Sequence, residues 1–172
     1  MRRVLVIGSG GAGKSTVAAR ISQRLGLPVI HLDALYWQPG WVETPADEWE
    51  QIVRQLLPRE AWVMDGNYGG TLDLRLAAAD AVVFLDTPRL LCLWRVVKRW
   101  AQFYGRSRPD MARDCPERLT EDFVRWIWRY PQEQRPRILD KLRAVEQEKR
   151  VVVLASTTEV CHFLDRLPSC AA

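Results

Sequence analysis

Short apolar runs alternate with longer amphipathic segments along this chain. Five mainly apolar runs of four to six residues lie at 3–8, 28–32, 61–64, 81–85 and 151–155. The first run is followed by 14–25, where Val17, Ala18, Ile21 and Leu25 recur at the spacings of three and four that predict a helix. Strands that alternate with helices in this way predict a three-layer α/β domain with a five-stranded parallel sheet.

The remaining helices are predicted from the same spacing. They cover 44–58, 72–78, most of 89–149, and a last segment at 157–167. We expect the long segment to break near 105–109 and at Pro131 and Pro136, because proline and glycine interrupt helices.

Several polar residues directly follow the predicted strands. They are Gly8, Asp33, Asp65, Asp86 and Ser156. In open parallel sheets, ligands bind at the carboxyl ends of the strands, so these residues should face one cleft.

Composition narrows the class of protein. The chain has 172 residues, of which 48% are hydrophobic and 27% charged, as expected for one ordered domain covering 1–172. The apolar run after Met1 is too short for a signal segment or a membrane span, so we expect a cytoplasmic protein without membrane contact. The four cysteines show neither zinc nor redox spacing.

Excess positive charge is confined to one segment. Between 95 and 137 there are eleven basic and six acidic residues, a net charge of +5, while the whole chain carries +4. Ten of the eleven are arginine, whose planar fork suits phosphate and carboxylate groups. A solvated helical face remains the alternative interpretation.

A phosphate-binding motif lies between the first strand and the first helix. The residues Gly8–Ser15, "GSGGAGKS", fit the pattern G-x-x-x-x-G-K-[ST]. Backbone N–H groups of such a loop surround the phosphates of ATP or another nucleoside triphosphate, with Lys14 bridging the β and γ phosphates and Ser15 binding Mg²⁺. The predicted nucleotide-binding residues are Gly8, Gly10, Gly11, Ala12, Gly13, Lys14, Ser15 and Thr16.

The whole chain resembles the P-loop kinases of the nucleotide and nucleoside kinase group, and is similar to adenylate kinase in layout. The narrower resemblance is to bacterial proteins described as adenylate kinase-like or as DNA topology modulation protein (FlaR-related). It is carried by the phosphate loop, "HLDALYW" with "PGW", "DGNY", and "CPERL" followed by "FVRWIWRY".

This resemblance implies roles for residues near the third strand. Adenylate kinases have a D-G-[FY]-P-R motif where this chain has Asp65, Gly66, Asn67 and Tyr68, which makes Asp65 a residue that holds Mg²⁺ through water. The Pro-Arg half is missing here. We expect Asn67 and Tyr68 to contact substrate, with Arg75 as a substitute for the lost arginine.

The resemblance also implies a set of catalytic arginines and a lid. Two arginines follow the aspartate of the D-V-P motif in adenylate kinases, and Arg95 and Arg99 follow Asp86 at the same spacings of nine and thirteen residues. On a helix they share one face and could both reach phosphate. Arg106, Arg108 and Arg113 would lie on a helical, arginine-rich lid at about 100–120.

Asp33 is the candidate partner of an acceptor hydroxyl. It follows the second strand, across from the phosphate loop, where a carboxylate can receive the hydroxyl proton. The acceptor region should span about 33–60, where Trp37 and Trp41, with Tyr36, could stack on a flat substrate or could simply pack. His31 is expected in the core of the second strand.

These residues lead to an ATP- and Mg²⁺-dependent kinase that phosphorylates a small-molecule hydroxyl, with a nucleoside as the favoured acceptor. A nucleoside monophosphate kinase is the nearest alternative, and another small alcohol, as in shikimate or gluconate kinases, is a third. A DNA-binding topology modulator without kinase activity is a different class, but the sequence has no recognisable DNA-binding motif, so nucleic acid is an unlikely partner. Both a monomer and a homodimer are compatible with the sequence.

Overall fold

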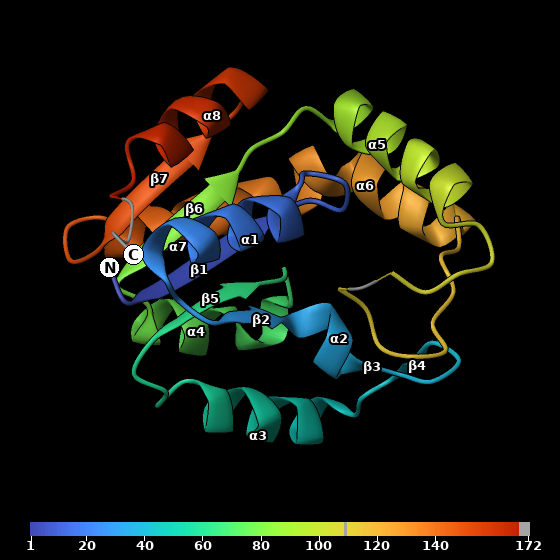
Figure 1. The fold of residues 1–172 in the computed structure, drawn as a ribbon, viewed down its shortest axis with the longest axis horizontal. Helices are drawn as coiled ribbons and strands as arrows, with labels where there is room; N and C mark the ends of the chain where they lie inside the picture. Colours follow the sequence, from blue (N-terminus) through green and yellow to red (C-terminus); the bar gives the residue numbers. More distant parts are fainter. Residues whose placement is uncertain (109, 169–172) are drawn as a thin grey trace.

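A parallel sheet forms the centre of the molecule in a computed structural model, which describes residues 1–108 and 110–168 (Figure 1). Its strand order is β2-β5-β1-β6-β7, and all neighbouring strands pair in parallel. The strands are β1 (Arg3–Gly8), β2 (Val29–His31), β5 (Trp62–Asp65), β6 (Ala81–Leu85) and β7 (Arg150–Leu154). The predicted five-stranded parallel sheet is therefore confirmed.

Helices cover both faces of this sheet, as predicted for three layers (Figure 1). They are α1 (Lys14–Leu25), α2 (Leu32–Tyr36), α3 (Ala46–Leu56), α4 (Leu72–Ala78), α5 (Arg89–Gln102), α6 (Glu121–Glu133), α7 (Arg135–Val145) and α8 (Thr157–Asp165). A short hairpin, β3 (Trp37–Gln38) and β4 (Val42–Glu43), follows α2, and a 3₁₀ turn, η1 (Gly69–Thr71), precedes α4.

Alternate residues of the central strands build two separate cores. Leu5, Ile7 and Phe84 pack with α3, α4 and α7 on one face, and Val4, Val6 and Val83 pack with α1, α5 and α8 on the other. The run from Val4 to Ile7 in β1 is continuously apolar, as expected for a strand that is buried on both faces.

The lid segment is less helical than the sequence suggested. Helix α5 ends at Gln102 and α6 begins at Glu121. Between them the described residues form turns and two isolated bridges, Tyr104 with Glu117 and Ser107 with Pro116. Gly105, with φ 69°, adopts a left-handed turn conformation three residues after α5 has ended. The predicted break at Pro131 does not occur, because α6 continues through it to Glu133.

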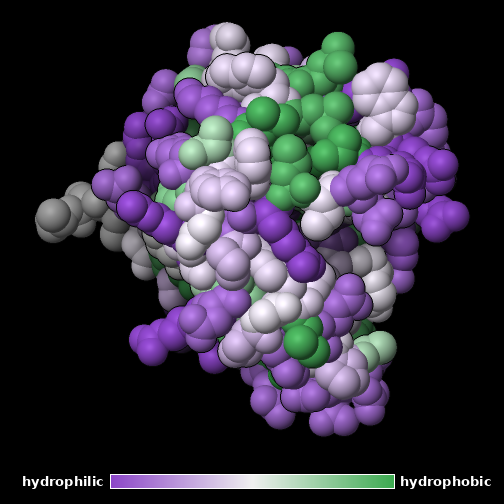
Figure 2. Space-filling model, turned by 90° about the vertical axis from the view of Figure 1, so that its right-hand side faces the viewer, coloured by the Kyte–Doolittle hydropathy of each residue, from purple (hydrophilic) through white to green (hydrophobic). Residues whose placement is uncertain are grey.

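The outer face of α5 carries exposed apolar side chains. Figure 2 shows apolar atoms gathered on this side of the molecule, where Leu90, Trp94 and Val97 are exposed. No helix in the described part of the chain has both the length and the apolar character needed to cross a bilayer.

The phosphate loop is also a packing element, because α5 lies directly against it. A Cβ atom added to Gly11, which has φ +76°, would lie 2.3 Å from the carbonyl oxygen of Cys92 on α5. Glycine at this position is thus required both by the backbone conformation and by the close approach of the helix.

We expect Gly11→Ala to lower the free energy of unfolding by about 2 kcal/mol or more, from strain and the clash with α5. Thermal unfolding should show a decrease in Tm of about 4–8 °C for a chain of this size. Gly70→Ala is the matched control, because a Cβ atom there has no neighbour within 4 Å. Equal Tm values for the two variants would contradict this packing role.

Candidate active site

The phosphate loop joins the end of β1 to the start of α1, and Lys14 is the first residue of that helix. The Lys14 ammonium donates a hydrogen bond to the Ser9 carbonyl at 3.0 Å. Burial lowers the pKa of Lys14, while the charges of Asp33 and Asp65 raise it. No carboxylate in the described residues forms an ion pair with Lys14, so the ammonium remains available for an anion.

Asp65 ends β5 and is paired with His31 at the end of β2. The two residues are partners in the parallel register, and His31 Nδ1 donates to Asp65 Oδ1 at 2.7 Å. This hydrogen bond raises the pKa of His31, although burial opposes it. His31 is therefore not the core residue we expected, because its side chain keeps 27% of its surface exposed and is bonded to Asp65.

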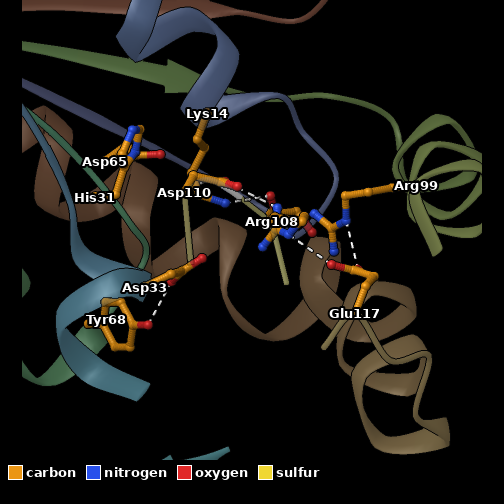
Figure 3. A network of polar contacts seen from close by, with 10 residues as sticks. Lys14, His31, Asp33, Asp65, Tyr68, Arg99, Arg108, Asp110 and Glu117 are labelled. Atoms are coloured by element: carbon orange, nitrogen blue, oxygen red, sulfur yellow. Dashed lines mark hydrogen bonds and ion pairs between the residues drawn. The ribbon is translucent and has the colours of Figure 1, made fainter. Parts of the chain in front are cut away.

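Asp33 lies in the first turn of α2, and Figure 3 shows its side chain on the opposite side of the strand ends from Lys14; we call the region between these two residues the cleft. The Tyr68 hydroxyl donates a hydrogen bond to Asp33 Oδ1 at 2.6 Å. Burial and the charge of Asp33 raise the pKa of Tyr68, so its phenol stays protonated and acts as the donor. The structure thus brings Lys14, Asp33, Asp65 and Tyr68 together at the carboxyl edge of the sheet.

Arg75 does not reach this cleft, in contrast to the expectation that it would contact substrate. Its side chain is fully buried, and its guanidinium donates to the carbonyls of Thr71 at 3.3 Å and Gly66 at 2.9 Å, and also to that of Tyr68. Burial lowers the pKa of Arg75 to about 10. Arg75 therefore holds the backbone of the loop after β5 and is not available to bind a phosphate.

Arg95 and Arg99 both project from α5, but toward different partners. Arg95 donates to the Ala12 carbonyl of the phosphate loop at 3.1 Å and to Thr157 Oγ1 at 3.2 Å. Arg99 donates to Glu117 Oε1 at 2.8 Å, and burial lowers its pKa. Arg95 thus lies against the nucleotide loop, whereas Arg99 connects α5 to the lid.

The lid arginines fall into two groups. Arg108 forms ion pairs with Glu117 at 2.8 Å and Asp110 at 3.1 Å, so Glu117 lies between Arg99 and Arg108 (Figure 3). Arg106 and Arg113 are exposed. The carboxylate of Glu117, only 2% exposed, therefore neutralises part of the positive charge next to the cleft.

The β3–β4 hairpin is fastened to the lid through Trp41. The Trp41 indole N–H donates to the Pro116 carbonyl at 2.9 Å, and the Arg118 guanidinium lies 4.5 Å from the ring centroid. The Gly40 N–H donates to the Asp114 carbonyl at 3.0 Å. We name these contacts between 38–41 and 114–118 the hairpin–lid clasp. Through these contacts the Trp41 indole packs within the protein. The Trp37 ring packs against that of Trp41, with 5.2 Å between the ring centroids.

A hollow of about 470 Å³ lies between the start of α3 and the loop after β5. The rings of Tyr36, Trp49 and Tyr68 line it, together with the carboxylates of Glu43 and Glu50. Glu43 accepts a hydrogen bond from the Tyr36 hydroxyl at 3.1 Å. The hollow is thus aromatic and acidic, and Tyr68 connects it to Asp33.

Two side-chain features near the strand ends were not predicted from the sequence. Asp86, at the end of β6, accepts from the Arg135 guanidinium at both of its oxygens, at 2.8 and 2.7 Å. Asn67 has a buried side-chain oxygen that accepts no hydrogen bond within the described residues. The Asp86–Arg135 pair spans 49 residues of sequence, and no local pattern predicts such a partner.

The donor set suits a magnesium–nucleotide complex better than a protein-enclosed metal ion. Within residues 1–108 and 110–168, no three histidine, cysteine or acidic side chains converge on one point. Mg²⁺ is commonly held by one or two protein oxygens together with phosphates and water. The Ser15 hydroxyl and the Asp65 carboxylate could provide such ligands. The Lys14 ammonium, which has no carboxylate partner among the described residues, could donate hydrogen bonds to phosphate oxygens.

Known protein sequences match this chain over part of its length. No family model matches the chain. The uncharacterized protein YqaC of Bacillus subtilis (strain 168) is 29% identical over 134 residues, covering 75% of this chain and 72% of that protein. An adenylate kinase of Kocuria rhizophila is 67% identical over 30 residues, which are 17% of this chain and 16% of that enzyme.

Solved structures resemble the whole fold. A gluconokinase from Sinorhizobium meliloti 1021 matches with a TM-score of 0.56 and 21% identity, covering 96% of this chain and 93% of that one. A shikimate kinase from Acinetobacter baumannii, in complex with shikimate, matches with a TM-score of 0.59 and 17% identity, covering 96% and 90%. The chain therefore has the P-loop kinase fold, as its resemblance to that group predicted.

Removing the Trp41 side chain should loosen the lid. We expect trypsin to cleave Trp41→Ala at lid arginines about fivefold faster than the unmodified chain, since the variant loses a hydrogen bond of about 1 kcal/mol together with the Arg118 contact. Cleavage sites would be identified by mass spectrometry. Trp94→Ala is the control, because Trp94 is exposed on α5. Equal cleavage rates for both variants would show that the clasp does not hold the lid.

Proposed function

We propose that this protein is an ATP- and Mg²⁺-dependent kinase that transfers the γ-phosphate to a small-molecule hydroxyl, with the 5′-hydroxyl of a nucleoside as the favoured acceptor. In this proposal residues 1–172 act as one kinase domain. The region 33–60 receives the acceptor and the lid at 100–120 closes over it.

The phosphate loop would bind the phosphate donor, ATP. Its N–H groups and Lys14 would neutralise the phosphate oxygens, with Arg95 approaching from α5. Ser15 and Asp65 would hold Mg²⁺, which supplies positive charge to the β and γ phosphates when it is bound. Arg99 holds Glu117 through its Nε atom, so its terminal nitrogens would be the atoms that reach the phosphates.

Asp33 would receive the proton of the acceptor hydroxyl. The acceptor oxygen would attack the γ-phosphorus, the bond from that phosphorus to the β–γ bridging oxygen would break, and the hydroxyl proton would pass to the Asp33 carboxylate. Asp33 lies across the cleft from Lys14, so a hydroxyl beside it would face a phosphate beside Lys14 (Figure 3). Closure of the lid would exclude water as a competing acceptor.

One observation favours a neutral acceptor over a nucleoside monophosphate. The hollow that Tyr68 shares with Tyr36 and Trp49 is lined by three aromatic rings and two carboxylates, and the Tyr68 hydroxyl connects it to Asp33. Arg75, the predicted ligand of an acceptor phosphate, is buried on backbone carbonyls. A second phosphate would meet the charges of Glu43 and Glu50, whereas a nucleobase could stack on the rings.

The similar solved structures support a hydroxyl acceptor, but their own acceptors are not nucleosides. Two of them are a gluconokinase and a shikimate kinase. Gluconate and shikimate carry a carboxylate, which favours a cationic pocket. The acidic hollow of this protein supports a neutral, flat acceptor instead.

A coupled ADP-release assay tests the proposal with ATP, Mg²⁺ and matched panels of nucleosides and nucleoside monophosphates. We expect turnover with at least one nucleoside. Lys14→Ala should abolish it, because the main phosphate cation is removed. Turnover that occurs only with monophosphates would contradict the proposed acceptor class.

The Asp33→Asn variant tests, in the same assay, whether Asp33 acts as the general base. We expect kcat to fall by about 10²–10⁴-fold, the usual contribution of a general base, with an unchanged Tm. Asp140→Asn is the matched control, because Asp140 is an exposed carboxylate on α7. A kcat of Asp33→Asn close to that of the control would remove Asp33 from the mechanism.

A further inference from the structure

The loop between β5 and η1 is held in place from inside the protein. The buried Arg75 guanidinium donates to the carbonyls of Gly66 and Tyr68 in this loop and to that of Thr71 at the end of η1, so one side chain fixes the loop and the turn that follows it. Gly66, with φ +144°, allows the loop to approach α2 closely, since an added Cβ atom would lie 2.8 Å from the Leu32 Cβ. The loop is therefore fixed directly beside the residue that precedes Asp33.

The ring of Tyr68 is fixed as well. Its centroid lies 4.4 Å from that of Tyr36 and 4.9 Å from that of Trp49, and the three rings pack at inclined angles. A ring enclosed on two sides has little freedom to rotate about its χ angles. Its hydroxyl is thus presented at a defined point, which is the Oδ1 atom of Asp33, 2.6 Å away.

Asp33 itself has few other restraints. Helix α2 contains only five residues, and within the described residues the Tyr68 hydroxyl is the only side-chain group that donates a hydrogen bond to Asp33. Without that bond, the carboxylate could adopt other rotamers, because Asp33 is only partly buried. With it, Oδ1 is occupied and Oδ2 remains available.

We infer that Tyr68 is a positioning residue that orients Asp33 for proton transfer, and that Arg75 supports it by fixing the loop. The inference rests on the proposed function, because it assigns Asp33 the acceptor hydroxyl. The Tyr68 phenol holds Oδ1, and Oδ2 receives the proton. Tyr68, the last residue of "DGNY", thus contributes a hydroxyl to the acceptor side at the position of the proline in the D-G-[FY]-P-R motif.

Tyr68→Phe tests this inference, because it removes only the hydroxyl and keeps the ring. We expect kcat to fall by about ten- to a hundredfold, the range for a hydrogen bond to a charged group, while the KM for the acceptor changes less than twofold. Tyr36→Phe is the matched comparison from the same aromatic cluster. Its hydroxyl faces Glu43 in the hollow, so its effect should fall on KM.

A double-mutant cycle separates positioning from general damage. In an Asp33→Asn background, Tyr68→Phe should lower kcat by less than twofold further, because the group that it orients is already disabled. A full additional tenfold loss in the double variant would overturn the inference, since Tyr68 would then act independently of Asp33. An unchanged kcat in the single Tyr68→Phe variant would overturn it as well.

Crystal structures of Tyr68→Phe and Tyr36→Phe provide a readout that does not depend on turnover. The Asp33 carboxylate should leave its orientation in the first variant and keep it in the second. If Asp33 keeps its orientation in Tyr68→Phe, the inference is wrong even if the kinase proposal holds. If the Asp33 carboxylate moves in Tyr68→Phe but the Asp33→Asn variant has a normal kcat, Tyr68 does orient Asp33. In that case Asp33 is not the proton acceptor, and the proposed function is wrong on this point.

Discussion

The parallel pairing of β1 between β5 and β6 is the constraint on which the site depends. This register places Val6 opposite Asp65 and Gly8 opposite Leu85, so the phosphate loop leaves the sheet beside the carboxylate that ends β5. The next strand, β2, pairs His31 with Asp65 and continues directly into Asp33. Two carboxylates and the Lys14 ammonium therefore meet at one edge because three strands end there together.

The charges around the cleft are arranged unequally. On the nucleotide side, Lys14 has no carboxylate partner among the described residues, and Arg95 contacts the backbone of the phosphate loop. On the lid side, Glu117 pairs with both Arg99 and Arg108, which reduces the free positive charge of the segment. The hollow proposed to receive the acceptor is aromatic and acidic. This distribution suits a phosphorylated donor on one side and an uncharged acceptor on the other.

The sequence predicted the parts of the fold that depend on local patterns. Apolar runs and the glycine-rich loop located the strands, α1 and Lys14, because burial and backbone conformation act on neighbouring residues. The partners of side chains could not be found in this way. Tyr68 meets Asp33 across 35 residues and Trp41 meets Pro116 across 75. Arg75 was expected in the cleft because its position in sequence suits that role, but the helix α4 turns its side chain into the core. Such contacts follow from tertiary packing, which spacing alone does not specify.

The central claim is that the cleft phosphorylates a hydroxyl and not a phosphate. Its most direct test is phosphorus NMR of the products formed from ATP, Mg²⁺ and an equimolar mixture of a nucleoside and its 5′-monophosphate. We expect a phosphomonoester resonance to grow as ATP is consumed, because the new bond joins phosphorus to an alcohol oxygen. Consumption of the monophosphate with growth of diphosphate resonances, and no increase in phosphomonoester, would contradict it.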